Sequence, residues 1–175
     1  LSQVFNFDLL TTPYEAKSLY QSIHGAFSIL SEVGALPTWA LSNHDSPRVA
    51  SRVGVEESKA LFIALLALPG SLYLYNGQEL SLPNAEVADA YRQDPVFHRT
   101  NGAQKGRDGA RVPLPWSSDL AELGFTQGRP WLPIPKEWQS LSVNRQEQEP
   151  GSSLHLYRRA LKARREFFSG EREII

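Results

Sequence analysis

The chain has 175 residues, a net charge of −1 and no cysteine. Hydrophobic residues make up 41% and charged residues 21% of it, as in an ordinary globular domain with a core. The missing cysteine excludes disulfides, thiolate nucleophiles and thiolate metal sites, and fits a cytoplasmic protein. Nothing in the charge or in the apolar runs points to a nucleic-acid or membrane partner. The chain also lacks methionine, even at position 1, which fits a part of a longer protein or a chain trimmed by processing.

The first 80 residues alternate between strand and helix patterns. In the first helical segment, apolar residues recur at spacings of three or four, and acidic residues open the second, where they suit the helix dipole. The order strand, helix, strand, helix, strand predicts a parallel sheet with right-handed crossovers. The expected strands are residues 3–10, 36–42 and 71–75, and the expected helices are 14–32 and 55–68.

Residues 81–142 have a different composition, rich in proline and holding three of the four tryptophans. We predict a long ordered loop there, which is unusual enough to suggest a function. Within this loop, residues 86–92 are a candidate for a short helix. Residues 151–168 have a clear helical pattern, with Ser152 or Ser153 as the N-cap and basic residues in the last turn.

Polar side chains follow each expected strand, at the edge of a parallel sheet where chemistry usually occurs. Two interpretations stay open for the central run, Asn43-His44-Asp45. It is a functional cluster, or it is a polar turn, since Asn, Asp, Ser and Pro are common turn formers. The other polar residues at this edge are Asp8, Asn76, Gln78 and Glu79.

A second candidate segment, KGRDGARVPLPW, places Arg107, Asp108 and Arg111 around a glycine, followed by an extended proline-rich backbone. Such a backbone can hold an arginine rigidly over a pocket. A surface loop with an ion pair is the simpler interpretation, and for this segment alone we favour it.

Other residues offer weaker candidates. Paired carboxylates carry out glycoside hydrolysis, but we favour structural roles for Asp8 and Glu79. The histidines have no metal-ligand spacing, so no metal is expected. Exposed aromatic rings can stack on sugars, although packing of the loop onto the core is the more common role. The aromatic candidates are Tyr91, Phe97, Trp116, Trp131 and Trp138.

Taken together, five segments resemble the α-amylase superfamily of glycoside hydrolases, in particular bacterial α-glucosidases and oligo-1,6-glucosidases. VFNFDLL, TWALSNHDSPRVASR and GSLYLYNGQELSLPN are similar to the sixth, seventh and eighth strands of its barrel. GRDGARVPLPW is similar to the segment that follows the eighth strand in exo-acting members. NRQEQEPGSSLHLYRRALKARRE is similar to the helix that ends the barrel.

The resemblance implies an α/β fold that is the C-terminal portion of a (β/α)8 TIM barrel, about strands six to eight with their helices. Residues 1–175 would form one partial catalytic domain. Within it, residues 1–80 would be three βα units, 81–142 an active-site loop region before the last helix, and 143–169 the terminal barrel helix.

The resemblance also implies roles for four residues. Asp45 would be the third catalytic carboxylate, which stabilises the transition state through the sugar hydroxyls. His44 would bind the same sugar, Arg111 would recognise the non-reducing glucose, and Arg48 would line the same mouth. The substrate would be an α-linked oligosaccharide or disaccharide, with no cofactor and no metal.

The nucleophile and the acid/base of this superfamily belong to the fourth and fifth strands, in the N-terminal part of the barrel. We therefore expect the 175-residue chain to be inactive alone and to require that missing part. Two alternatives to an α-glucosidase remain. One is a glucosyltransferase or isomerase of the trehalose or isomaltulose synthase type. The other is a non-catalytic amylase-like scaffold domain, which would not need an unbroken sugar-binding set.

Overall fold

The computed structural model describes residues 3–167 of the chain. Three parallel strands form one sheet in the order β1–β2–β3, as predicted. The strands are β1 (Gln3–Asn6), β2 (Leu36–Ala40) and β3 (Ser71–Tyr73). The helices are α1 (Ala16–Ser31), α2 (Val49–Val53), α3 (Val55–Leu66), α4 (Pro95–Arg99), α5 (Val143–Gln148) and α6 (Ser153–Phe167).

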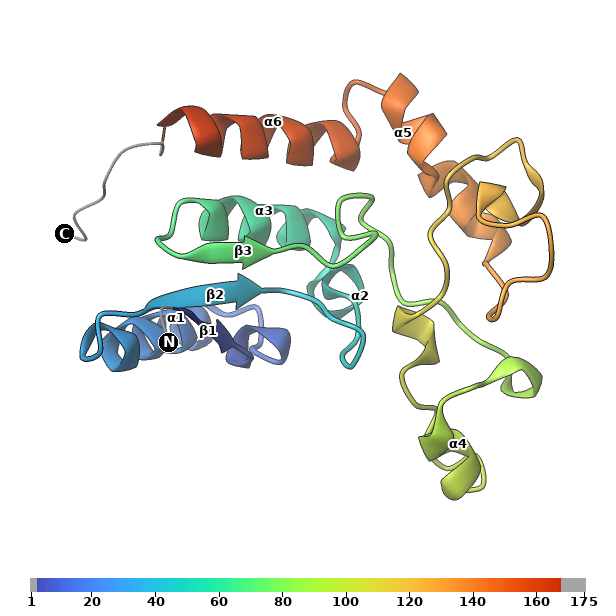
Figure 1. Ribbon diagram of the computed structural model, residues 1–175, viewed down its shortest axis with the longest axis horizontal. Helices are drawn as coiled ribbons and strands as arrows, with labels where there is room; N and C mark the ends of the chain where they lie inside the picture. Colours follow the sequence, from blue (N-terminus) through green and yellow to red (C-terminus); the bar gives the residue numbers. More distant parts are fainter. Residues whose placement is uncertain (1–2, 168–175) are drawn as a thin grey trace.

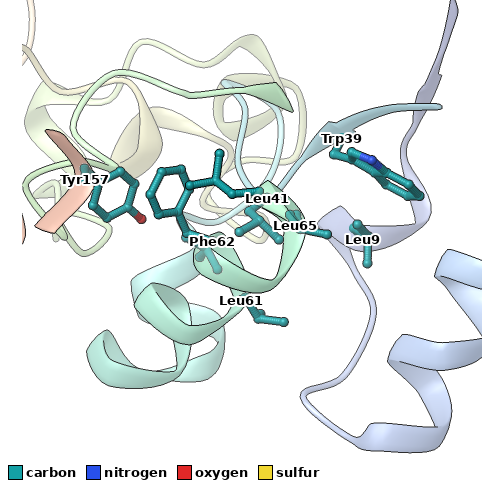
Figure 2. Close-up of a cluster of buried hydrophobic side chains, with 9 residues drawn as sticks. Leu9, Trp39, Leu41, Leu61, Phe62, Leu65 and Tyr157 are labelled. Atoms are coloured by element: carbon teal, nitrogen blue, oxygen red, sulfur yellow. The ribbon is translucent and has the colours of Figure 1, made fainter. Parts of the chain in front are cut away.

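The main hydrophobic core joins the sheet to α3 and α6. Trp39 of β2 is fully buried, and its Nε1 donates a hydrogen bond to the Pro69 carbonyl at 2.8 Å. The rings of Phe62 on α3 and Tyr157 on α6 stack with centroids 3.8 Å apart, and Figure 2 shows them facing each other. The buried members of this core are Leu9, Trp39, Leu41, Val49, Leu61, Phe62, Leu65, Leu66 and Tyr157.

A second hydrophobic core lies within the proline-rich segment, beyond the carboxyl ends of the strands. In Figure 1 this segment occupies the side of the molecule toward which the strand arrows point. Outside residues 81–142, Leu80 and Leu154, at the start of α6, also contribute to this core. The buried members are Leu80, Leu82, Ala85, Val87, Val112, Leu114, Leu132, Trp138 and Leu154. The segment is therefore packed on a core of its own, although most of it has no regular secondary structure.

Several predicted boundaries differ from the structure. The first strand ends at Asn6, because the Asn6 Oδ1 accepts the Leu9 N–H at 3.2 Å and the chain turns into a 3-10 helix. Residues 86–92 contain only a 3-10 turn, Asp89–Tyr91. The expected terminal helix, 143–169, is two helices, since Pro150 and Gly151 separate α5 from α6. Residues 168 and 169 of that prediction lie outside the described residues.

The sheet leaves large apolar side chains uncovered. Phe5 of β1 and Tyr73 of β3 are 45% and 56% exposed, and their rings meet edge to face at 5.0 Å. Phe7 stacks on Phe5 at 5.7 Å and is also exposed. β3 is therefore not buried on both faces, whereas Trp39 of β2 is fully buried. No helix between residues 3 and 167 has both the length and the apolarity to cross a bilayer.

Candidate active site

The turn after β2 is organised by the Asn43 side chain. Its Oδ1 accepts hydrogen bonds from the Asp45 N–H at 2.9 Å and from the Ser46 N–H and hydroxyl at 2.9 and 2.8 Å. Just before it, the Ser42 hydroxyl accepts the Val49 N–H at 2.7 Å and fixes the start of α2. The polar run is thus a true turn, and the same bonds fix the Asp45 backbone at the carboxyl end of the sheet.

Asp45 is the centre of a charged cluster. Its Oδ1 accepts hydrogen bonds from Arg107 Nη1 and Arg111 Nη2, both at 2.8 Å. Its Oδ2 lies 3.4 Å from His44 Nε2. Arg111 also donates from Nε to the His44 carbonyl at 2.8 Å, which ties the loop segment to the turn. Three residues predicted from the sequence, His44, Asp45 and Arg111, therefore lie together.

The surroundings of Asp45 favour a charged, accessible carboxylate. Its side chain is 49% exposed, so the carboxylate is accessible from solvent. Partial desolvation acts to raise the pKa of Asp45, but the nearby His44 and the hydrogen bonds from Arg107 and Arg111 outweigh it and lower the pKa below its ordinary value. A carboxylate of this kind is suited to accept hydrogen bonds and to stabilise positive charge, and is poorly suited to donate a proton.

Arg107 is held from behind by the buried Asp94. The Asp94 Oδ2 accepts from Arg107 Nε at 2.7 Å and from the Arg107 N–H at 2.9 Å. The Oδ1 accepts the Val96 N–H at 3.0 Å and caps α4. Gly106 permits this approach, since it has a φ of +73° and an added Cβ would lie 2.7 Å from the Asp94 Cβ. These bonds, first of all that from the Arg107 side chain, lower the pKa of Asp94 strongly.

Asp108 joins the same segments from the inside. It is fully buried, and its Oδ2 accepts the N–H groups of Gln93 and Asp94 at 2.8 and 3.0 Å. It also opens the 3-10 turn Asp108–Ala110, whose next residue is Arg111. One buried carboxylate therefore sets the positions of the Asp94 backbone and of the turn that presents Arg111.

The lowered pKa of Asp94 predicts an acid-dependent loss of stability. A carboxyl group whose pKa is lowered in the folded state stabilises the fold at pH values above its unfolded-state pKa of about 3.9. This stabilisation is lost as the pH falls from that value through the folded-state pKa. We expect Asp94→Asn to be less stable than wild type near neutral pH, with the difference narrowing below about pH 4. Urea unfolding across this range measures it. Asp119→Asn, at an exposed carboxylate, is the control and should change the free energy of unfolding near neutral pH by less than Asp94→Asn does. A difference in the free energy of unfolding between wild type and Asp94→Asn that stays constant over this pH range would contradict the prediction.

The comparison with known families decides the classification. The alpha-amylase family, described as alpha amylase, catalytic domain, matches residues 2–169. The chain belongs to the alpha-amylase family. Its sheet, with helices in the crossovers, is part of the TIM barrel of these enzymes.

Three similar proteins place the chain within the alpha-amylase family. A probable alpha-glucosidase of Rhizobium meliloti (strain 1021) is 40% identical over 146 residues, covering 78% of this chain and 26% of that protein. The crystal structure of the alpha-glucosyl transfer enzyme XgtA is 34% identical, with a TM-score of 0.75, over 89% of this chain and 30% of that one. The trehalulose synthase MutB from Pseudomonas mesoacidophila MX-45 is 28% identical, with a TM-score of 0.75, over 85% and 31%. The chain thus spans about a quarter to a third of the length of these relatives.

Arg48 does not join the Asp45 cluster. It is 3% exposed, and its guanidinium donates to the Asn76 carbonyl at 2.6 Å and to the Ala110 carbonyl at 3.0 Å. It also lies over the Tyr75 ring, 4.9 Å from its centroid. This burial is at odds with the expected place of Arg48 at the mouth of the site. In this alpha-amylase family chain, the residue instead supports the backbone next to Arg111 from behind.

We expect Arg48→Met to destabilise the protein by about 1.5–3 kcal/mol, because it leaves buried carbonyls without a charged donor. Arg158→Met is the matched control. Arg158 is half-exposed and paired with Glu147 at 2.8 Å, so its loss should change the free energy of unfolding by less than about 1 kcal/mol. Guanidinium unfolding of both variants measures the difference. Equal losses of unfolding free energy in Arg48→Met and Arg158→Met would contradict the role of Arg48 in supporting the backbone next to Arg111.

The structure adds two residues, Arg107 and Asp94, to the site expected from the sequence. Arg107 was noted in the sequence, but a surface ion pair was favoured there, and nothing in the local sequence connects it to Asp45. Asp94 has no motif at all. Glu79 accepts the Gly77 N–H at 2.9 Å, which supports the structural role favoured for it. Among residues 3–167 no three His, Asp or Glu side chains gather as a metal site.

Proposed function

We propose that the chain supplies the Asp45 side of the active site of a retaining, exo-acting α-glucosidase. The observation that carries this proposal is the half-exposed Asp45 carboxylate, fixed by two arginines at the carboxyl end of a parallel sheet. Its substrates would be maltose-type or sucrose-type oligosaccharides with a terminal α-linked glucose. The 40% identity to the protein of Rhizobium meliloti named probable alpha-glucosidase supports this choice.

In this proposal Asp45 accepts hydrogen bonds from hydroxyls of the glucose bound at the cleaved linkage. It stabilises the oxocarbenium-like transition state because the positive charge on the sugar ring grows as the bond breaks. His44 binds the same sugar. Arg111 recognises the non-reducing glucose, and Arg107 holds Asp45 in place through the same oxygen, Oδ1, that Arg111 contacts. The lowered pKa favours the ionised form of Asp45.

We place β1, β2 and β3 as strands six, seven and eight of the barrel. Residues 1–80 would then be three βα units, 81–142 the active-site loop region and 143–169 the end of the barrel. A complete barrel needs about 250 residues. Retaining hydrolysis also needs a nucleophile and an acid/base about 5–5.5 Å apart. Of the carboxylates joined to this cluster, Asp94 and Asp108 are buried and Asp45 is accessible, so we propose that the 175 residues alone are inactive.

Hydrolysis of p-nitrophenyl α-glucoside and of maltose tests the proposal. The whole protein should release glucose with retained configuration, observed by NMR of the first-formed anomer. The isolated 175-residue chain should release none above a buffer blank. Absence of glucose release by the whole protein would overturn the α-glucosidase assignment, and glucose release by the isolated chain would overturn its inactivity.

A second candidate is transfer of the glucosyl group to a sugar instead of water. It is favoured by the 34% identity to the alpha-glucosyl transfer enzyme XgtA and by the match to a trehalulose synthase. The same assay separates the two: with concentrated sucrose or maltose, a transferase forms isomers or longer oligosaccharides, whereas a hydrolase forms free monosaccharides. The cytoplasmic location expected from the sequence stays a prediction.

A further inference from the structure

A tyrosine hydroxyl and an arginine converge on the peptide group that precedes Arg111. The Ala110 carbonyl accepts one hydrogen bond from the Tyr75 hydroxyl and another from Arg48 Nη2, both at 3.0 Å. These two donors use both lone pairs of the carbonyl oxygen. Ala110 is 1% exposed, so water has little access to replace either bond. The Ala110 carbonyl is therefore fixed by two side chains that belong to other segments of the chain.

Tyr75 is itself held in place. It lies two residues beyond the end of β3, at the carboxyl end of the sheet. The Arg48 guanidinium lies over its ring, 4.9 Å from the centroid, where a cation is attracted to the aromatic face. The same guanidinium donates from Nη1 to the carbonyl of the next residue, Asn76, at 2.6 Å. The direction of the Tyr75 hydroxyl is thus set by its own strand and by Arg48.

The fixed carbonyl determines where the Arg111 side chain begins. The Ala110 carbonyl and the Arg111 N–H belong to one planar peptide group. The Arg111 N–H donates to the Asp108 carbonyl at 2.9 Å, so both polar groups of this peptide are bonded. From there Arg111 reaches the turn after β2, where Nε donates to the His44 carbonyl and Nη2 to Asp45 Oδ1, both at 2.8 Å. Arg111 therefore connects the ends of two neighbouring strands, β2 and β3.

A second tyrosine of the same strand has a different environment. Tyr73, the last residue of β3, is 56% exposed, and its ring meets Phe5 edge to face at 5.0 Å. Within residues 3–167, the turn that presents Arg111 is bonded to the Tyr75 hydroxyl and not to that of Tyr73. The two tyrosines form a matched pair, which separates this contact from the general effect of removing a phenol hydroxyl near the end of β3.

We propose that Tyr75 is a positioning residue for Arg111 and acts through the Ala110 carbonyl. Loss of the Tyr75 hydroxyl leaves this buried carbonyl with one side-chain donor, Arg48, and allows the peptide group before Arg111 to tilt. The tilt displaces the start of the Arg111 side chain and weakens its two bonds to the turn after β2. The contact itself is independent of the proposed function, whereas its effect on catalysis rests on that function.

Tyr75→Phe is expected to raise KM of the whole protein for p-nitrophenyl α-glucoside about fivefold, the effect of losing one neutral hydrogen bond, while kcat stays nearly unchanged. KM rises because Arg111 is proposed to bind the non-reducing glucose in the ground state and the transition state alike. The value of kcat is retained because Asp45 stays bonded to Arg107 at 2.8 Å. Tyr73→Phe is the matched control and should change neither constant.

A second measurement follows Arg111 without any hydrolysis. In the whole protein with isotopically labelled arginine, the Arg111 Nε–H resonance is assigned by its loss in Arg111→Met. Its hydrogen exchange with water should be about fivefold faster in Tyr75→Phe and unchanged in Tyr73→Phe. Tyr75→Phe keeps the ring over which Arg48 lies, and its melting curve should show a folded protein. In the Arg111→Met background, Tyr75→Phe should have no further effect on KM, because the two residues act as one unit.

Three results would overturn the positioning role. They are an unchanged Arg111 exchange rate in folded Tyr75→Phe, equal effects of Tyr75→Phe and Tyr73→Phe, and a KM rise that persists in full in the Arg111→Met background. If the whole protein releases no glucose but the Arg111 resonance responds to Tyr75→Phe, the positioning role stands and the α-glucosidase proposal fails. If glucose is released and the resonance does not respond, the positioning role alone is withdrawn.

Discussion

Asp45→Asn is expected to lower kcat/KM for α-glucoside hydrolysis by the whole protein by about 100- to 1,000-fold, while the protein folds normally. This is the magnitude found when one group that stabilises developing charge is removed, about 2.7–4 kcal/mol. The amide keeps the shape of the side chain but loses the negative charge that balances Arg107, Arg111 and the oxocarbenium-like sugar. Because the stabilisation belongs to the transition state, kcat should fall much more than KM rises.

The control for this prediction is Asp89→Asn. Asp89 is also a carboxylate held by two cations, Lys105 at 2.8 Å and Arg92 at 3.0 Å, but it lies outside the Asp45 cluster. Its loss should leave kcat/KM unchanged. Initial rates with p-nitrophenyl α-glucoside, together with circular dichroism and a melting curve, measure both variants. An Asp45→Asn enzyme with wild-type activity would refute the role of Asp45.

Phe62→Ala is expected to reduce the free energy of unfolding by about 3–5 kcal/mol, the range for removal of a buried aromatic side chain. Phe62 is fully buried, and its ring stacks on Tyr157 with an interplanar angle of 11°. The pair joins α3 to α6, so its loss leaves a cavity where the last helix meets the sheet layer (Figure 2). Urea unfolding, followed by tryptophan fluorescence, measures the change.

A second readout accompanies this prediction. Burial raises the pKa of Tyr157 to about 12, partly opposed by a hydrogen bond from Gln78. In a folded Phe62→Ala protein the ring is more hydrated, so that pKa should fall toward its ordinary value. Phe167→Ala is the matched control, since Phe167 is 81% exposed and its removal should change stability by less than about 0.5 kcal/mol. Equal losses for both phenylalanines would contradict the packing role of Phe62.

The regular part of the fold was predictable because its signals are local. Hydrophobic periodicity placed the helices at 14–32 and 55–68, and the structure has α1 at Ala16–Ser31 and α3 at Val55–Leu66. The N-cap predicted at Ser152 or Ser153 is confirmed, since Ser152 Oγ accepts the His155 N–H at 3.3 Å. The parallel order of the strands followed from the alternation of elements and is also confirmed.

The remaining features of the fold and of the site could not be predicted, because they depend on contacts between residues far apart in the sequence. The short helices α2 and α4 have too few residues for a periodic pattern. The one local signal, Asp94 as N-cap with Pro95 as the first residue of α4, does not by itself predict a helix. His44, Asp45 and Arg111 were named through the family resemblance, and the structure brings them together. Arg107 belongs with them only because the buried Asp94 orients it, and that contact joins residues of no recognisable motif. Arg48 was misplaced because its sequence position beside the turn does not reveal that its guanidinium points into the interior.

The two hydrophobic cores also bear on how substrate preference can diverge among relatives. Asp45 is carried by the sheet, but Arg107 and Arg111 reach it from 62 and 66 residues further along the chain. The positions of those arginines are determined by the proline-rich segment, which packs on its own core. Insertions or substitutions in this segment can change the orientation of both arginines while the strands stay unchanged. Natural variation in sugar choice is therefore expected to accumulate within residues 81–142, and the turn that carries Asp45 is expected to stay constant.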